Sequence, residues 1–137
     1  MNKPIAYWIK RLDAALEAHL DSTLAKMKLS RKQWQTINIL AERPLRPAAL
    51  NEALLPLWGS DTKHRESELA SLVGRGMIVM VDEVIALSER GRAARSEAEW
   101  RLRDSREEIT AGIGIDEYAI AVSVLERMAL NAERLAG

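Results

Sequence analysis

Apolar residues three or four positions apart mark both ends of the 137-residue chain. This spacing runs over residues 5–27 near the N-terminus and over residues 116–135 near the C-terminus. It matches one face of an α-helix. The sequence therefore predicts two long amphipathic helices, and their apolar faces are too extensive for one small domain to bury.

The segment between these ends predicts shorter helices. They run from Ser30 to just before Pro44, from Pro47 to near Pro56, and within residues 59–76. Ser30 and Gln33 have the spacing of a capping box, in which each side chain bonds the other's backbone N–H. Gly59, Ser60 and Asp61 are expected to supply a turn and a cap, and Gly76 to end the third helix.

Two short apolar runs follow, Met77–Val81 and Val84–Leu87, separated only by Asp82-Glu83. They predict a β-hairpin. An isolated hairpin is marginally stable in water, so we expect its apolar face to pack on the preceding helices. A helix from 89 to about 111 comes next, with six basic and six acidic residues, which favours a solvent-exposed rod.

Three short helices, a hairpin and a connecting helix form the plan of a winged helix-turn-helix. The predicted fold is mainly α with a small β-hairpin wing, flanked by N- and C-terminal dimerisation helices. We expect one domain over residues 1–137. Its core would span 29–92 with the wing at 77–87, and the dimerisation helices would span 5–27 and 93–135.

Composition limits the chemistry. Lys and Arg number 20, and so do Asp and Glu, so net charge gives no overall attraction to nucleic acid, although residues 1–46 hold nine basic against four acidic residues. Without Cys, disulfides and thiolate metal sites are excluded. We find no nucleophile motif, phosphate loop or paired carboxylates, and expect no enzyme, cofactor or metal. No membrane span or signal peptide is seen, which predicts a cytoplasmic protein.

The sequence resembles the MarR family of bacterial transcriptional regulators over nearly its whole length. The matching pieces occur in the family's order: Leu29-Ser30 with Gln33 and Trp34, Leu50 with Leu54, LASLVGRGMI (69–78), IALSERGR (85–92) and DEYAIAVSVLERMALNAE (116–133). The resemblance implies a homodimeric transcriptional regulator that binds double-stranded DNA and that in some members responds to a ligand.

The candidate DNA-binding residues form two groups. Ser60, Thr62, Lys63 and Arg65 stand at the start of the third short helix, where a recognition helix reads the major groove. The alternative is a helix cap with a solvated first turn, and Arg65 lies close to the core stripe. Arg31, Lys32 and Arg46, together with Arg43, flank the helix that starts at Ser30 and are candidate phosphate contacts or a solvated face.

The outer helices carry the other candidates. Leu12, Leu16, Leu125 and Met128 are expected to be buried between two subunits. Trp8 and Trp34 are candidates for a pocket that takes a small apolar or aromatic effector, although Trp at helical spacing is commonly core.

Two features depart from the family. Its wings usually carry a basic residue, whereas this tip is Asp82-Glu83, and residues 59–76 balance three basic against three acidic residues. Both features predict weak DNA binding. They motivate an alternative function, a winged-helix dimerisation or partner-binding module that has lost DNA binding. An enzyme's dimerisation domain is a third possibility, opposed by the lack of a following catalytic domain.

Overall fold

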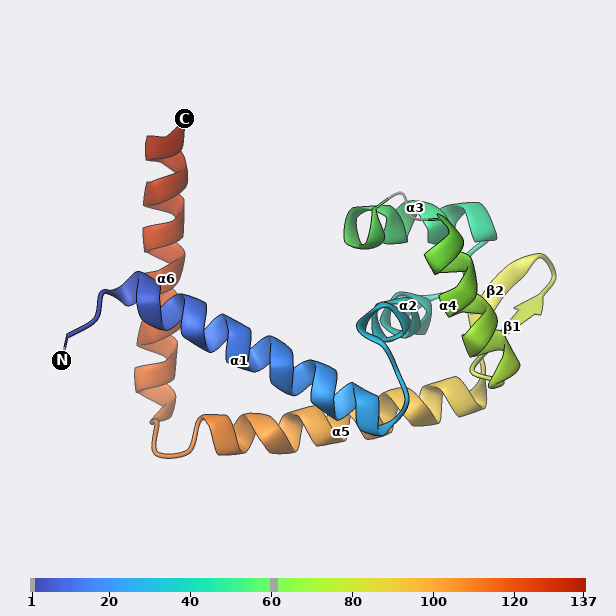
Figure 1. The fold of residues 1–137 in the computed structure, drawn as a ribbon, viewed down its shortest axis with the longest axis horizontal. Helices are drawn as coiled ribbons and strands as arrows, with labels where there is room; N and C mark the ends of the chain where they lie inside the picture. Colours follow the sequence, from blue (N-terminus) through green and yellow to red (C-terminus); the bar gives the residue numbers. More distant parts are fainter. Residues whose placement is uncertain (1, 60–61) are drawn as a thin grey trace. The chain divides into compact units, whose positions relative to one another are not determined.

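The computed structural model describes residues 2–59 and 62–137, apart from the side chain of Thr62. It divides into two compact units, Met1–Arg103 and Asp104–Gly137. The described elements are shown in Figure 1: α1 (Ile5–Lys26), α2 (Arg31–Glu42), α3 (Pro47–Trp58), α4 (Thr62–Gly74), β1 (Ile78–Val81), β2 (Val84–Leu87), α5 (Glu89–Ile109) and α6 (Ile115–Ala136). This order confirms the predicted mainly helical, winged helix-turn-helix fold.

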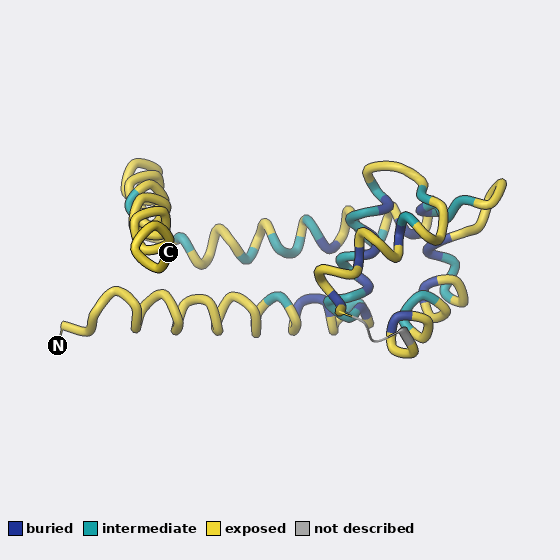
Figure 2. Tube along the Cα trace, turned by 90° about the horizontal axis from the view of Figure 1, so that it is seen from above, coloured by how far each residue is buried: buried dark blue, intermediate teal, exposed yellow. Residues whose placement is uncertain are grey.

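The core of the first unit is centred on α2, which contacts α1, α3, α4 and β2. Ile37 and Leu40, on one side of α2, are almost completely buried. Figure 2 shows buried residues concentrated in this part of the chain. The buried apolar cluster comprises Leu24, Leu29, Ile37, Leu40, Leu50, Leu54, Trp58, Leu72, Met77, Ile78, Leu87 and Ala98.

The end of α3 differs from the sequence prediction. The sequence predicts a stop near Pro56, but the helix continues to Trp58 with Pro56 inside its last turn. Burial of Trp58, which is 7% exposed, favours these two extra residues despite the backbone donor that Pro56 lacks. Gly59 ends the helix instead: its φ is 69°, and its N–H donates to the Leu55 carbonyl, as is common at helix C-termini.

The predicted hairpin is present, and it is not free-standing. β1 and β2 pair antiparallel, with Ile78 opposite Leu87 and Val81 opposite Val84. Leu45 adds a one-residue bridge to Ile85 on β2, with N–H···O distances of 3.0 and 2.6 Å. The hairpin therefore packs on the helical core, as expected because an isolated hairpin would be only marginally stable.

The base of the hairpin packs closely against the start of α5. Ser88 Oγ donates to the Gly76 carbonyl and accepts the Gly91 N–H at 3.1 Å. Gly91 is buried, and a Cβ at this position would lie 2.2 Å from the Met77 carbonyl oxygen and 2.6 Å from Leu87 Cδ1. Only glycine allows this approach of α5 to the wing.

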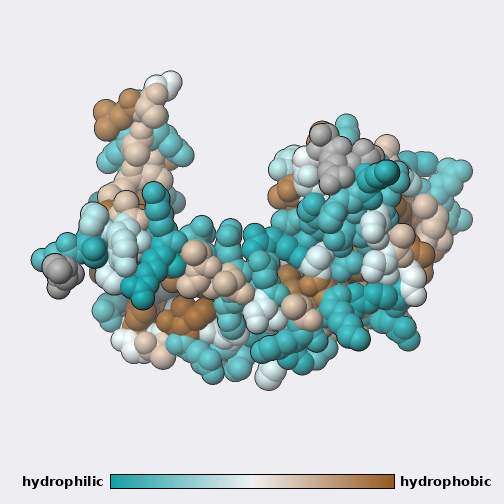
Figure 3. Space-filling model, in the orientation of Figure 1, coloured by the Kyte–Doolittle hydropathy of each residue, from teal (hydrophilic) through white to brown (hydrophobic). Residues whose placement is uncertain are grey.

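The long outer helices expose their apolar stripes. In the second unit, α6 has no buried residue, and its exposed apolar side chains include Tyr118, Val122, Leu125 and Met128. In the first unit, every α1 residue before Leu20 is exposed. Figure 3 shows hydrophobic side chains on the surface of α6.

Within the described residues, no helix combines the length and hydropathy needed to cross a bilayer.

Replacing Gly91 by Ala should destabilise the first unit. The added methyl must displace Met77 backbone and the Leu87 side chain, so we expect the free energy of unfolding to fall by about 3 kcal/mol. Urea denaturation followed by circular dichroism measures this change. Gly74→Ala is the matched control, because nothing lies within 4 Å of its Cβ position. It should be neutral or stabilising by up to about 1 kcal/mol, and equal effects of the two variants would contradict the packing argument.

Candidate nucleic-acid interface

The exposed side of α4 is the candidate DNA-reading surface. Lys63, Glu66, Ser67 and Ala70 are all exposed, and their spacing of three, one and three residues places them on one helical face. We call these four residues the outer face of α4. The opposite side packs inward through Leu72, which is completely buried, and contacts α2 and β1.

The four predicted recognition residues differ in exposure and in whether the structure describes them. Lys63 lies in the first turn of α4 and is exposed on the outer face. Arg65 is only 8% exposed, on the inner side near Leu72, as its position relative to the core stripe indicated. Ser60 lies outside the described residues, and Thr62 begins α4 without a described side chain.

The outer face has almost no net charge. It carries one cation, Lys63, and one carboxylate, Glu66, beside the small residues Ser67 and Ala70. Small side chains permit a close approach of the helix backbone to another surface. The balance of charge means that this face attracts a polyanion only weakly.

The predicted phosphate contacts are engaged in contacts within the chain. Arg31, at the start of α2, donates from Nε and Nη2 to the two carboxylate oxygens of Asp21 at 3.0 and 2.9 Å, and Glu17 lies 3.6 Å away. Arg46, just before α3, lies 3.3 Å from the wing-tip carboxylate of Glu83. Both arginines therefore have carboxylate partners already.

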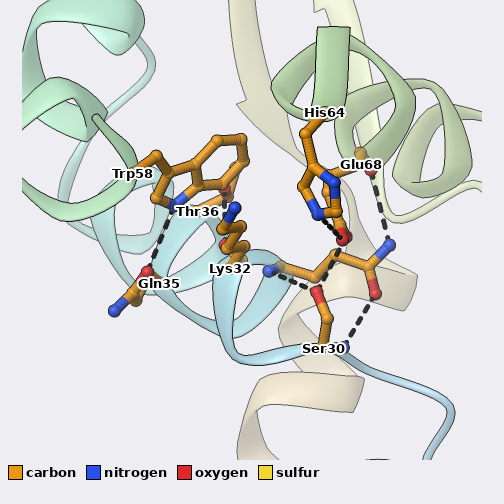
Figure 4. A network of polar contacts seen from close by, with 8 residues as sticks. Ser30, Lys32, Gln35, Thr36, Trp58, His64 and Glu68 are labelled. Atoms are coloured by element: carbon orange, nitrogen blue, oxygen red, sulfur yellow. Dashed lines mark hydrogen bonds and ion pairs between the residues drawn. The ribbon is translucent and has the colours of Figure 1, made fainter. Parts of the chain in front are cut away.

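Lys32 has an aromatic partner instead. Its Nζ lies 5.7 Å from the centre of the Trp58 ring, within the range of a cation–π contact. The Trp58 Nε1–H donates to Gln35 Oε1 at 3.1 Å. Figure 4 shows Lys32 and Gln35 of α2 placed around this ring. The contact anchors the side chain of Lys32 beside the end of α3.

A polar network joins the start of α2 to α4 (Figure 4). Ser30 Oγ accepts the Gln33 N–H at 3.0 Å, and Gln33 Oε1 accepts the Ser30 N–H at 3.0 Å, which confirms the predicted capping box. Ser30 Oγ also donates to Glu68 Oε2 at 2.7 Å. The other oxygen of Glu68 lies 3.2 Å from His64 Nε2. Glu68 thus couples the cap of α2 to the first turns of α4.

Sequence reasoning identified Ser30 and Gln33 but missed Glu68. Its side chain is only 15% exposed, and it is the residue through which the network reaches α4. The sequence feature that could have indicated Glu68 is a carboxylate four residues after His64, on the inner side of the same helix.

Among the described residues, no group of three or more His, Asp or Glu side chains is placed to hold a metal ion.

The two candidate effector-pocket residues occupy different parts of the first unit. Trp8 is about half exposed and packs edge-on to Tyr7, with ring centres 5.1 Å apart. Trp34 packs against the core cluster, which contains Leu24. Trp8 and Leu24 both lie on α1, about 24 Å apart along the helix. The pocket therefore remains a prediction.

An open groove of about 490 Å³ lies beside the polar network. Its walls come from the end of α1, the start of α2 and the side of α4, including Lys28, Gln33, Ser67 and Glu68. Neither Trp8 nor Trp34 contributes to it. Its lining mixes polar side chains with the apolar Ala25 and Leu29, and it contains none of the tryptophans on which the expected effector site rested.

Solved structures of MarR family proteins share this fold over nearly the whole chain. MepR, a transcription regulator of the Staphylococcus aureus multidrug efflux pump MepA, is similar with a TM-score of 0.79 at 14% identity, over 95% of this chain and 99% of that one. A Mycobacterium tuberculosis MarR family protein in complex with DNA gives 0.71 at 20% identity, over 93% and 98%. The reduced form of MarR from E. coli gives 0.68 at 18% identity, over 93% and 95%.

No protein-family model and no curated protein matches the sequence. The likeness to solved structures therefore rests on the arrangement of helices and hairpin. It shows that the chain has the winged-helix fold of MarR family proteins, and at the level of the fold it confirms the resemblance drawn from the sequence.

Removing the Ser30 hydroxyl should loosen the link between α2 and α4. Ser30→Ala loses the helix cap and the hydrogen bond to Glu68, so we expect a loss of about 2 kcal/mol in the free energy of unfolding. Thermal denaturation compares it with Ser30→Thr, which keeps the hydroxyl and should retain most of the stability. A Ser30→Ala protein as stable as the original would show that the network contributes nothing.

Proposed function

We propose that this protein is a DNA-binding transcriptional regulator that acts as a homodimer. The observation that carries the proposal is the outer face of α4, a continuous exposed stripe on the second helix of a helix-turn-helix. Support also comes from the shared fold, since one structure that matches over 93% of this chain is a complex with DNA. A regulator of this kind acts in the cytoplasm.

In the proposed mode of binding, α4 enters the major groove of double-stranded DNA. The first turns of a recognition helix reach the base edges, which favours Lys63 as the leading contact. Thr62 would act beside it, and Ser60 on a phosphate. Burial of Arg65 makes its stem part of the core, so its guanidinium would have to extend along the helix to reach DNA.

The proposed dimer would cover the apolar stripes that each chain leaves exposed. Leu125 and Met128 are exposed on α6, and Leu12 and Leu16 on α1. Exposed apolar surface of this extent on a small protein marks an interaction site. A two-fold axis would bury the same residues on both copies. A small apolar or aromatic effector near Trp8 or Trp34 belongs to the same proposal.

A second candidate function follows from the charges. The outer face of α4 has one cation and one carboxylate, and Arg31 and Arg46 already have carboxylate partners. These features favour a winged-helix module that binds a protein partner and has lost DNA binding. DNA binding itself separates the two functions.

Lys63→Ala should weaken binding to DNA fragments recovered by genomic selection at low salt. Because Lys63 carries a positive charge into the groove, losing it leaves about one more phosphate charge to counterions and should lower the slope of log affinity against log salt by about 0.9. Fluorescence anisotropy over a salt series measures this change. Lys10→Ala, which removes an exposed lysine from α1, should leave the slope unchanged. If no fragment is recovered, the partner-binding function replaces this one. If fragments are recovered but Lys63→Ala binds them normally, the outer face of α4 is not the DNA-reading surface.

Leu125→Arg should break the dimer. Removing a buried leucine from both copies costs at least about 3 kcal/mol, which raises the dimer Kd more than about 100-fold. Ser123→Arg adds the same charge at an exposed position of α6 outside the stripe and should leave the dimer intact. Sedimentation at micromolar concentration measures both variants, and a monomeric unmodified protein would refute the proposed assembly.

A further inference from the structure

The ion pair between Arg46 and Glu83 joins the start of the helix-turn-helix to the tip of the wing. Arg46 Nη1 lies 3.3 Å from Glu83 Oε2 and donates a hydrogen bond to it. The two residues are 37 positions apart in the sequence. Arg46 is a predicted phosphate contact, so its carboxylate partner bears directly on DNA binding.

Backbone pairing sets up this contact. Leu45 and Ile85 exchange hydrogen bonds as an antiparallel bridge. In the register of this bridge, Arg46 lies opposite Val84, one position from the residue opposite Glu83. The backbone bridge that attaches the wing therefore places Arg46 and Glu83 close to each other.

The hairpin turn holds Glu83 close to that bridge. Asp82 and Glu83 are the two central residues of the turn, with φ of 51° and 68°. Positive φ at both positions is typical of the tight two-residue turn that usually contains Gly or Asn. A turn this short leaves Glu83 only two residues from Ile85, within reach of Arg46.

A carboxylate on Arg46 occupies the donors that a phosphate would use. Guanidinium groups bind carboxylates and phosphates through the same N–H donors. Both side chains are largely exposed, at 69% for Arg46 and 84% for Glu83, so the pair can open toward solvent. Exposed pairs are weak, which corresponds to about a two- to five-fold effect on an equilibrium that must break one.

We propose that Glu83 is an intramolecular competitor of DNA phosphate for Arg46, so that Arg46 contributes to DNA binding only when this ion pair opens. The inference rests on the proposed function. Competition differs from simple electrostatic repulsion between an acidic wing and DNA. Repulsion acts with any residue at position 46, whereas competition requires Arg46.

A double-mutant cycle separates competition from repulsion. Glu83→Gln removes the charge that pairs with Arg46, and Asp82→Asn removes the neighbouring charge, which has no contact with Arg46 among those seen for the described residues. Each is made with Arg46 intact and with Arg46→Gln, in the full-length protein. Affinity for a fragment recovered by genomic selection is measured over a salt series, with the melting temperature of every variant.

Glu83→Gln should raise affinity by about two- to five-fold more than Asp82→Asn. It should also steepen the salt dependence by about 0.9, as one phosphate contact is gained. When Arg46 is replaced by Gln, Glu83→Gln should affect affinity and salt dependence no more than Asp82→Asn does. The inference would be overturned if Glu83→Gln and Asp82→Asn gave equal gains. It would also be overturned if the excess gain of Glu83→Gln over Asp82→Asn persisted when Arg46 is replaced by Gln.

Failure of the inference and failure of the proposed function give different results. If Lys63→Ala weakens binding while Glu83→Gln behaves like Asp82→Asn, the protein binds DNA but Glu83 does not compete for Arg46. If neither the unmodified protein nor the Glu83→Gln variant binds DNA at low salt, both ideas are wrong.

Discussion

Burial of one side of α2 is the interaction on which the rest of the first unit depends. Ile37 and Leu40 are almost fully buried, in a cluster with residues from α1, α3, α4, the hairpin and α5. Arg95 of α5 adds a polar contact to Asn38 on α2 at 2.9 Å. Because α4 and the hairpin both pack on this helix, the positions of the candidate reading surface and of the wing follow from one buried face.

Several arginines of this protein pair with carboxylates at short range. Arg31 is held by Asp21 and Glu17, Arg46 by Glu83, and Arg95 by Glu99. Exposed pairs such as these contribute little to stability. Their larger effect is on the electric field at the surface, because a paired arginine attracts a distant polyanion far less than a free one. At Arg31, Arg46 and Arg95, pairing therefore leaves the surface close to locally neutral.

The sequence was sufficient where structure is set locally. The capping box at Ser30, the hairpin and the two long outer helices follow from spacing within a few residues, and all are present. The end of α3 was mispredicted because burial of Trp58 outweighs the local effect of Pro56. Sequence spacing also could not show that Ser30 bonds Glu68, 38 positions away, or that Arg46 pairs with Glu83. Such pairs depend on which elements meet in space, and no periodicity encodes that.

The bare surface of α6 has a consequence for how much folded protein a cell holds. A helix of 22 residues with no buried side chain gains little stability from its own chain, since most helical stability in proteins comes from packing of an apolar face. Whatever covers the helix therefore supplies much of its order. If that cover is a second copy, folding becomes linked to concentration by mass action. Abundance would then control function twice, by setting how many chains exist and by setting what fraction of them is folded.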